Sequence, residues 1–206
     1  MDHGRVPADV SSVEERAELR RLRALEVLAE LSVLEGLSEL GTVEVTGSVA
    51  HRLVVAHDID VDVTADALDA RACFDVVGRL AADPRVARVV YTNATERFGW
   101  LSFDVVCHFA GETWTIELYV NGPDACCFGW TSELARVLSG VLTPEHRHAI
   151  LELKEALADD PDYRSMDVYR AVVDDGVRTL DEFRAWREQH GSADLVRWIP
   201  ATVSPA

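Results

Sequence analysis

The sequence predicts an α+β protein: a small mixed β-sheet with flanking helices, followed by a C-terminal helical region. Three observations lead to this fold class. A long helical pattern opens the chain, short strand-like segments with one helix among them occupy residues 42–120, and helical signals alone follow from Thr131 onward. We therefore expect an α+β domain over residues 1–130 and a helical region over residues 131–206 that packs on it.

The first expected element is one helix over residues 12–40. Ser12 and Glu15 form a capping box at its start. Leucine then recurs at every third position, at Leu19, Leu22, Leu25, Leu28, Leu31, Leu34 and Leu37. We predict that this broad leucine face is buried in a core, and that Gly36 bends the helix.

Five strands are expected in the middle of the chain. Alternating apolar and polar residues place them at 42–46, 58–63, 85–91, 101–109 and 112–120. A helix over residues 66–82 would connect the second strand to the third. The last two strands read as a hairpin that turns at Ala110-Gly111, and this register places Asp104 directly opposite Glu117.

The C-terminal region carries helix-start signals. Thr143-Pro144 is a cap residue followed by proline at the first helical position, and Thr179 with Glu182 makes a capping box. Residues 121–130 read as a loop that joins the sheet to these helices.

Composition excludes several classes of protein. Of 206 residues, 36 are acidic and 20 are basic, so the formal net charge is −16. Such a surface repels phosphate backbones and anionic lipid headgroups, so we expect no nucleic-acid and no membrane partner. The chain shows no secretory signal, no membrane-spanning run and no cysteine pattern typical of disulfide frameworks or zinc sites, which predicts a cytoplasmic protein.

The strand at 58–63 carries the first chemical signal. Side chains alternate along a strand, so Asp58, Asp60 and Asp62 share one face while Ile59 and its alternate neighbours are buried on the other. Adjacent carboxylates in this row are separated by about 6.5–7 Å. A divalent cation such as Mg²⁺ between the first two would remove their repulsion. The alternative is an acidic strand face in solvent.

The hairpin carries the second signal. Asp104 and Glu117 face each other across it, and like charges in that position destabilise a sheet. A metal site shared with Asp58 and Asp60 explains two acid-rich faces in one small sheet. The alternative is a longer turn with a different register, which leaves one acid exposed.

The stretch GSVAHRLVVAHDIDVDV (47–63) resembles the signature of the nucleotidyltransferase superfamily that includes DNA polymerase beta. That signature is a Gly-Ser at a strand end, a short helix, a strand with two alternating aspartates, and a third carboxylate on a later strand. The resemblance covers roughly residues 40–120, and the spacing is similar to that of small bacterial members such as aminoglycoside- and lincosamide-modifying enzymes. Two departures concern Arg52, where small members often have a second glycine, and His57, where they often have serine.

The resemblance implies a role for each matched position near the Gly-Ser. Gly47 and Ser48 would hold the triphosphate, because glycine lets the backbone approach closely and the serine hydroxyl can donate to phosphate oxygens. Arg52 is a candidate triphosphate clamp. A surface ion pair is the alternative for Arg52.

The carboxylates take the remaining roles that the resemblance implies. Asp58 and Asp60 would coordinate Mg²⁺. Glu117 would complete a second metal position or accept the proton of the attacking hydroxyl, with Asp104 as the competing third carboxylate.

The predicted function is Mg²⁺-dependent transfer of a nucleoside monophosphate from a nucleoside triphosphate to a hydroxyl or phosphate of a small molecule, in antibiotic modification or biosynthesis. One alternative is a non-catalytic member of the fold that binds a nucleotide or a partner protein. Another is an antitoxin-like enzyme that modifies proteins by AMPylation. The complete set of Asp58, Asp60 and Glu117 favours an enzyme.

Overall fold

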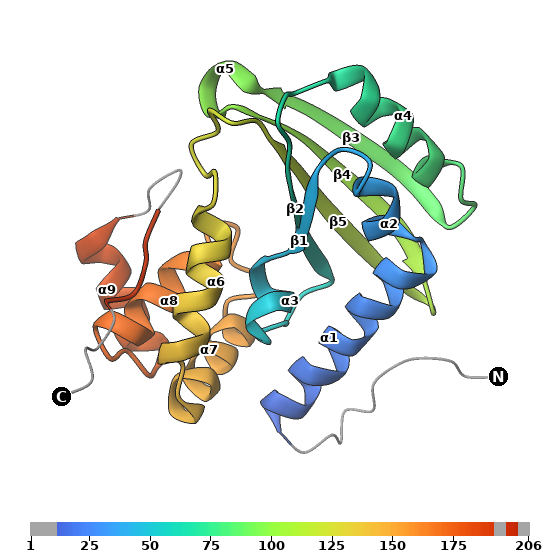
Figure 1. The fold of residues 1–206 in the computed structure, drawn as a ribbon. Helices are drawn as coiled ribbons and strands as arrows, with labels where there is room; N and C mark the ends of the chain where they lie inside the picture. Colours follow the sequence, from blue (N-terminus) through green and yellow to red (C-terminus); the bar gives the residue numbers. More distant parts are fainter. Residues whose placement is uncertain (1–11, 192–196, 202–206) are drawn as a thin grey trace.

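The alternating strand segments form a five-stranded mixed sheet in a computed structural model, which describes residues 12–191 and 197–201 (Figure 1). The strands are β1 (Thr42–Val45), β2 (Asp58–Thr64), β3 (Val86–Ala94), β4 (Trp100–Phe109) and β5 (Glu112–Asn121). Their order is β1-β2-β5-β4-β3, with β2 parallel to β5 and the other neighbours antiparallel. The predicted α+β class is confirmed. Residues 1–11 of the first expected domain, and residues 192–196 and 202–206 of the second, lie outside the described residues.

Helices surround this sheet in two groups. The first group is α1 (Val13–Glu30), α2 (Val33–Leu37), α3 (Gly47–His51), α4 (Ala70–Ala81) and α5 (Thr95–Phe98). The second is α6 (Trp130–Val141), α7 (Pro144–Ala156), α8 (Ser165–Asp174) and α9 (Leu180–His190). Figure 1 shows the second group gathered on one side of the molecule, with α3 between these helices and the sheet. In the part of the chain that the structure describes, no helix is long and apolar enough to cross a membrane.

The two faces of β2 have opposite character, as the alternation predicts. Ile59, Val61 and Val63 are fully buried in the core under α1, α2 and α4. The three aspartates of the strand point to the other face. The side-chain alternation on which the candidate site depends is therefore confirmed.

The hairpin has the expected turn and register. Ala110 and Gly111 both have positive φ, 50° and 83°, as a tight two-residue hairpin turn requires. Asp104 pairs with Glu117 across the antiparallel β4 and β5. The alternative of a longer turn is thereby excluded.

The single helix expected over residues 12–40 is wrong. The chain breaks at Ser32, which adopts a left-handed conformation with φ 50°, and Gly36 lies inside α2 rather than at a bend. The buried leucine stripe is also wrong in part, because Leu19 is 44% exposed and Leu22 is 46% exposed. A step of three residues rotates about 60° short of a full helical turn, so leucines at this spacing spread around the helix and cannot all face one core.

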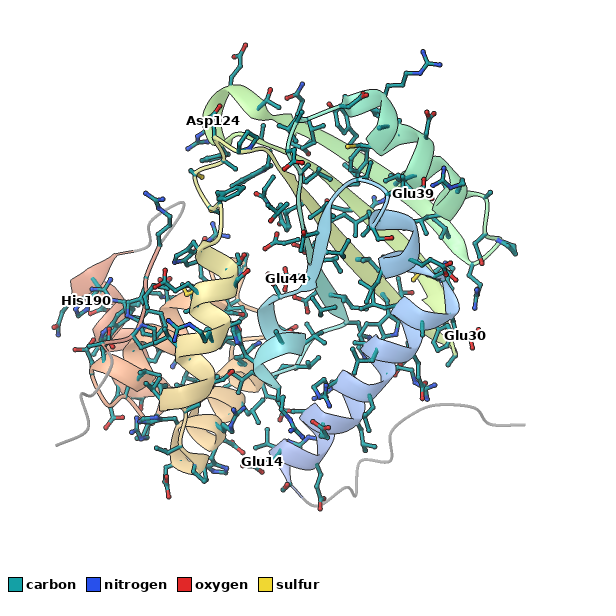
Figure 2. All side chains as sticks on the ribbon, viewed as in Figure 1. Glu14, Glu30, Glu39, Glu44, Asp124 and His190 are labelled. Carbon is teal, nitrogen blue, oxygen red and sulfur yellow. The ribbon has the colours of Figure 1, made fainter. Side chains whose placement is uncertain are left out.

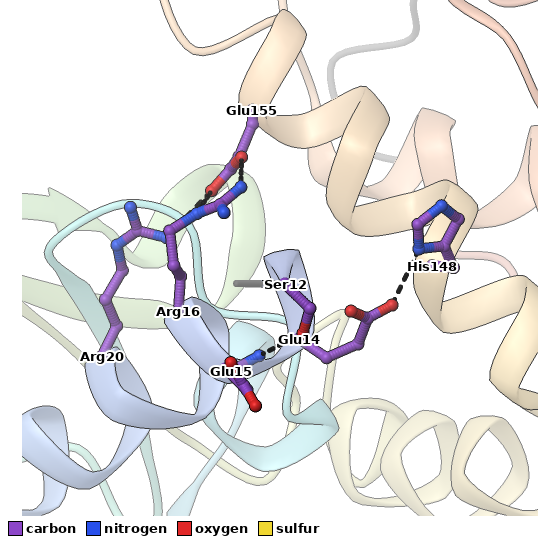
Figure 3. Close-up of polar contacts among 7 residues, drawn as sticks. All are labelled: Ser12, Glu14, Glu15, Arg16, Arg20, His148 and Glu155. Carbon is purple, nitrogen blue, oxygen red and sulfur yellow. Dashed lines mark hydrogen bonds and ion pairs between the residues drawn. The ribbon is translucent and has the colours of Figure 1, made fainter. Parts of the chain in front are cut away.

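Helix α1 connects two clusters of buried apolar side chains. Its second half packs in the sheet cluster through Ala24 and Val27, whereas Val13 and Ala17 belong to the cluster of the C-terminal helices. Polar contacts fasten the same end of α1 to α7 (Figure 3). They join Arg16 and Arg20 to Glu155, and Glu14 to His148. The helix therefore fixes the C-terminal helices relative to the sheet, and with them the cavity between the two parts.

Candidate active site

The turn between β1 and α3 brings the Gly-Ser pair against β2. Thr46 donates its backbone N–H to the carbonyl of Asp60 at 2.9 Å, and Gly47 follows with a φ of 56°. A Cβ added at Gly47 would overlap the carboxylate of Asp60. Glycine is therefore required here for two reasons: the backbone has a positive φ, and the Asp60 carboxylate leaves no room for a Cβ.

The hydroxyl of Ser48 is an unsatisfied polar group at this turn. Its Oγ is buried and has no hydrogen-bond partner within the described residues. A buried hydroxyl without a partner costs free energy, which a ligand oxygen at this position would recover. Gly47 and Ser48 thus lie where the sequence predicts a phosphate-binding turn.

Asp58 and Asp60 lie in β2, and Glu117 is the register partner of Asp60 on the parallel strand β5. Neighbouring strands are about 4.8 Å apart, so Glu117 is one strand away from Asp60 and Asp104 is two strands away. Burial is the main cause that raises the pKa of Asp60 to about 7, and the nearby Glu117, Asp58 and Asp62 raise it further. The structure brings Glu117, rather than Asp104, next to the first two carboxylates.

Glu117 is itself held in place. The hydroxyl of Tyr119, whose pKa burial raises, donates to Oε2 of Glu117 at 3.0 Å. Burial raises the pKa of Glu117, and the negative charges of Asp58 and Asp104 contribute. The hydrogen bond from Tyr119 therefore fixes the orientation of the Glu117 carboxylate.

A cavity of about 460 Å³ lies over these residues. Its floor is formed by Asp58, Asp60 and Asp62. Other lining residues come from the β1–α3 segment and α8, and they are Thr46, Gly47, Ser48, His51, Ser165, Met166 and Tyr169. The remaining ones come from the corner of α5 with β4, from β5 and from the segment entering α6: Phe98, Trp100, Tyr119, Asn121, Cys127, Trp130, Thr131 and Leu134. Glu117 lies beside Asp60 and is not among the described lining residues.

A buried lysine, which the sequence reasoning missed, lies behind this cavity. Lys154 of α7 donates to the carbonyl of Leu53 at 2.7 Å and lies 3.4 Å from the hydroxyl of Tyr169. Burial lowers the pKa of Lys154 to about 8, while the charges of Asp58 and Asp60 oppose that shift. A signal was present in the sequence, because Lys154 falls on the apolar face of its helix, four residues after the buried Ile150.

His51 closes the same end of the cavity as a neutral ring. Burial lowers its pKa to about 4, and the positive charges of Lys154 and Arg147 contribute. Its Nδ1 is buried without a hydrogen-bond partner in the described part of the chain, and its ring contacts Tyr169 edge-on with centroids 5.9 Å apart. His51 therefore offers a neutral polar edge beside the positive charge of Lys154.

The structure does not bring Arg52 to this cavity. Arg52 follows the last residue of α3 in a left-handed conformation, at the opposite end of this short helix from Gly47. Its guanidinium forms an ion pair with Glu18 of α1 at 3.1 Å, and its side chain is 59% exposed. This is the surface ion pair that the sequence left open as the alternative to a triphosphate clamp.

Comparison with known proteins identifies the fold. The poly(A) polymerase complex GLD-2–GLD-3 matches with a TM-score of 0.56 and 15% identity, over 80% of this chain and 58% of that chain. The GLD-2/RNP-8 complex matches with a TM-score of 0.52 and 14% identity, over 91% and 72%. The CdnC:HORMA-deltaN complex of E. coli MS115-1 matches with a TM-score of 0.51 and 17% identity, over 83% and 65%. This chain has the nucleotidyltransferase fold.

The comparisons establish the fold of the chain and no closer relationship. No protein-family model and no curated protein sequence matches the chain. The chain spans 58% of the length of the chain that it matches in the first structure. These structures share the fold that the sequence resemblance implies, and they do not support the narrower resemblance to aminoglycoside- and lincosamide-modifying members.

Within this nucleotidyltransferase fold, the residues present fit Mg²⁺ together with a triphosphate. Asp58 and Asp60 repel each other and Glu117, and Ser48, whose hydroxyl is unsatisfied, lines the same cavity as the two aspartates. Among the described residues, no three His, Cys, Asp or Glu side chains form a complete metal-binding set. Mg²⁺ is commonly held by one or two carboxylates with water and substrate phosphates, so Asp58 and Asp60 are the pair that would hold it.

Proposed function

We propose that this protein is a Mg²⁺-dependent nucleotidyltransferase that transfers a nucleoside monophosphate from a nucleoside triphosphate to a hydroxyl or phosphate of a small molecule. The observation that carries the proposal is the pair Asp58 and Asp60 in the wall of a 460 Å³ cavity, with the Asp60 carboxylate directly against Gly47. The fold, shared with a poly(A) polymerase complex, supports the same reaction class.

The chain's own groups account for triphosphate binding. Gly47 allows a phosphate to approach the backbone, and the Ser48 hydroxyl donates to a phosphate oxygen. Lys154 supplies a buried positive charge close to Asp58 and Asp60. A buried cation attracts a phosphate more strongly than an exposed one does, because less water screens it.

The chemical step is an in-line attack on the α-phosphorus. The acceptor oxygen forms a bond to this phosphorus, the bond to the bridging oxygen of the β-phosphate breaks, and pyrophosphate leaves with the electron pair. Glu117 accepts the proton of an attacking hydroxyl through its carboxylate oxygen that Tyr119 does not engage, and its raised pKa suits this role. When bound, Mg²⁺ neutralises charge on the phosphates and on the leaving pyrophosphate.

The charge of the protein favours a small acceptor. The chain has a formal net charge of −16, and the cavity floor consists of three aspartates. A nucleic-acid strand would be repelled over many phosphates, whereas a small molecule meets only the cavity. For this reason we extend the reaction class of the poly(A) polymerase structures to this chain, but not a nucleic-acid acceptor.

Calorimetric titration with each of the four ribonucleoside triphosphates, with and without Mg²⁺, tests the proposal. Wild-type protein should bind at least one of them only when Mg²⁺ is present, and Asp60→Asn should abolish that binding. Asp75→Asn is the matched control, because it makes the same chemical change on the exposed side of α4. Absence of Mg²⁺-dependent binding in the folded wild type, or full binding by Asp60→Asn, would overturn the proposal. With a bound triphosphate identified, pyrophosphate release in the presence of candidate acceptors then tests transfer.

A further inference from the structure

The segment between β5 and α6 carries two adjacent cysteines at the wall of the cavity. Figure 2 shows this segment running from the end of the sheet, near Asp124, to the start of α6. Cys127 lines the cavity and is 9% exposed, whereas Cys126 is more accessible. Both thiols are free, and the proposed phosphate chemistry uses neither of them.

A tight turn brings the two sulfur atoms together. Phe128 donates its backbone N–H to the carbonyl of Ala125 at 3.0 Å, so Cys126 and Cys127 are the central residues of a β-turn. Adjacent side chains in an extended strand point to opposite sides. In this turn the two Sγ atoms are instead 3.6 Å apart, within the distance of a sulfur hydrogen bond. The pair is therefore a preformed dithiol.

Backbone contacts join this dithiol to the cavity wall. Cys126 donates its N–H to the carbonyl of Phe98 at 2.9 Å, and its own carbonyl accepts a hydrogen bond from Arg197. The carbonyl of Cys127 accepts the N–H of Trp130, the first residue of α6, at 3.0 Å. Phe98 and Trp130 also line the cavity. A change in the backbone of the pair therefore displaces the wall of the cavity.

The two thiols differ in accessibility and in protonation. Burial, and then the hydrogen bond with Cys126, raise the pKa of Cys127 to about 12, so Cys127 keeps its proton at neutral pH. Cys126 is the thiol that an oxidant in solution reaches first, because it is the more exposed of the two. Cys126 is therefore the attacking thiol, and Cys127 supplies the second sulfur.

We propose that Cys126 and Cys127 are a site of reversible oxidation by hydroperoxides to a vicinal disulfide, and that this disulfide weakens binding of Mg²⁺-triphosphate in the cavity. The oxidation is independent of the proposed function, whereas its effect on binding rests on it. Adjacent Cα atoms are about 3.8 Å apart across a trans peptide, below the minimum of about 4.4 Å that ordinary disulfides span. Closing the bond therefore strains the turn and the cavity wall attached to it. A strained disulfide is readily reduced, so the oxidation is reversible.

The oxidation consists of two balanced steps. The Cys126 thiolate attacks one oxygen of the hydroperoxide, an S–O bond forms, and the O–O bond breaks. The leaving oxygen keeps the electron pair, takes up the proton that the thiol released and departs as an alcohol, or as water from hydrogen peroxide, which leaves a sulfenic acid. The Cys127 sulfur then attacks the Cys126 sulfur, an S–S bond forms, and the sulfenic hydroxyl leaves as water with the Cys127 proton. The two thiols lose two electrons, and the hydroperoxide gains them.

Mass spectrometry of the tryptic peptide of residues 98–136, which contains the pair and no methionine, tests the site. After treatment of the folded wild type with hydrogen peroxide, this peptide should lose two hydrogen atoms, and glutathione should restore them. Cys127→Ala should instead form a dimedone adduct at Cys126, because the sulfenic acid has no second thiol to attack it. Cys107→Ala is the matched control, since it removes a fully buried thiol of the sheet core, and it should still lose the two hydrogen atoms. An unchanged wild-type peptide, or loss of two hydrogen atoms in Cys127→Ala, would overturn the proposal.

Calorimetric titration of reduced and oxidised wild type tests the effect on the cavity. Oxidation should weaken Mg²⁺-triphosphate binding by at least about fivefold, the lower end of the usual coupling between two sites. By linkage, a saturating triphosphate should lower the ratio of disulfide to dithiol in a glutathione redox buffer by the same factor. Cys126→Ala should bind equally before and after peroxide treatment. If its binding also weakened, oxidation of Met166, which lines the cavity too, would account for the effect and the proposal would be overturned.

Failure of this proposal is distinguishable from failure of the proposed function. Equal affinity of reduced and oxidised wild type for Mg²⁺-triphosphate overturns the effect of the disulfide on the cavity and leaves the proposed function in place. Absence of triphosphate binding by reduced wild type overturns the proposed function, and the effect on binding fails with it. The masses of the 98–136 peptide still decide whether Cys126 and Cys127 are oxidised to a disulfide.

Discussion

Replacing Asp60 by asparagine should stabilise the ligand-free protein while it removes metal-dependent nucleotide binding. Burial and three neighbouring acids raise the pKa of Asp60 from 3.8 to about 7. In the unfolded chain the group has its ordinary pKa, so the folded protein holds the Asp60 proton more tightly. Ionised Asp60 therefore destabilises the fold, and asparagine removes this cost.

The size of the effect follows from the difference in pKa. A difference of about three units corresponds to a ceiling of about 4 kcal/mol at pH 8, at about 1.4 kcal/mol per unit. Water in the open cavity screens part of this repulsion, so we expect about 1–3 kcal/mol. For a chain of this length, this corresponds to an increase in Tm of about 3–10 °C.

The sign and the pH window of the effect are specific. For a carboxyl group with a raised pKa in the folded state, the cost is absent below the unfolded pKa, grows as pH rises from about 4 to about 7, and is constant above that. Urea denaturation without metal should therefore show Asp60→Asn as more stable than wild type at pH 8, with the difference below about 1 kcal/mol at pH 4.5.

Asp75→Asn provides the control for a general charge effect, because the protein is strongly acidic. The exposed site should change stability by less than about 0.5 kcal/mol at both pH values. Equal stability of wild type and Asp60→Asn at pH 8, or the same difference at both pH values, would refute the electrostatic reasoning. Excess Mg²⁺ and triphosphate should stabilise wild type, by about 2.7 kcal/mol at a hundredfold excess over Kd, but not Asp60→Asn.

Three other predictions concern the same cavity. Gly47→Ala should lower the free energy of unfolding in urea by about 1–3 kcal/mol and weaken Mg²⁺-triphosphate binding. The reasons are the φ of 56° at Gly47 and the overlap of a Cβ there with Asp60. The control is Gly129→Ala, which has a φ of 69° and open space around it and should cost only about 1 kcal/mol. Lys154→Met should weaken Mg²⁺-tripolyphosphate binding in calorimetry more than Lys154→Arg does, since only the arginine keeps the charge. The affinity of wild type for Mg²⁺-triphosphate should fall by up to about tenfold per pH unit below pH 7, because Asp60 must release its proton to bind the metal. The affinity should also fall above pH 8, because Lys154 loses its charge. An affinity that is constant between pH 5 and 9 would contradict both assignments.

Local rules were sufficient to predict the sheet and its carboxylates. Strand alternation sets the face of Asp58 and Asp60, and the two-residue turn at Ala110-Gly111 sets the register that pairs Asp104 with Glu117. These features depend on residues close together in the chain. The parallel pairing of β2 with β5 joins segments far apart in the sequence, and it places Glu117, rather than Asp104, on the strand next to Asp60.

Tertiary contacts explain what the sequence pattern did not predict. The charge of Arg52 suggested a phosphate clamp, but the docking of α1 places Glu18 within 3.1 Å of it. Lys154 lies about a hundred residues after the aspartates in the chain, and its hydrogen bond to the carbonyl of Leu53, in the segment between α3 and β2, holds its charge near them. At the break at Ser32, the residues on both sides, Leu31 and Val33, pack in the same cluster of buried side chains over the sheet.

The aspartates of β2 show how one strand pattern can carry two chemistries. By alternation alone Asp60 and Asp62 are equivalent positions on one face. In the structure, the charged groups that raise the pKa of Asp60 are mainly other carboxylates, so a cation is the ligand that relieves its environment. Burial also raises the pKa of Asp62, but hydrogen bonds from Thr131, Asn121 and Thr46 oppose that shift. A residue surrounded by hydrogen-bond donors, with one oxygen still unpaired, accommodates another donor more readily than a metal ion. Asp60 and Asp62 therefore differ by their neighbours, and Asp60→Asn should remove Mg²⁺-dependent triphosphate binding while Asp62→Asn retains it, although the two substitutions are chemically identical.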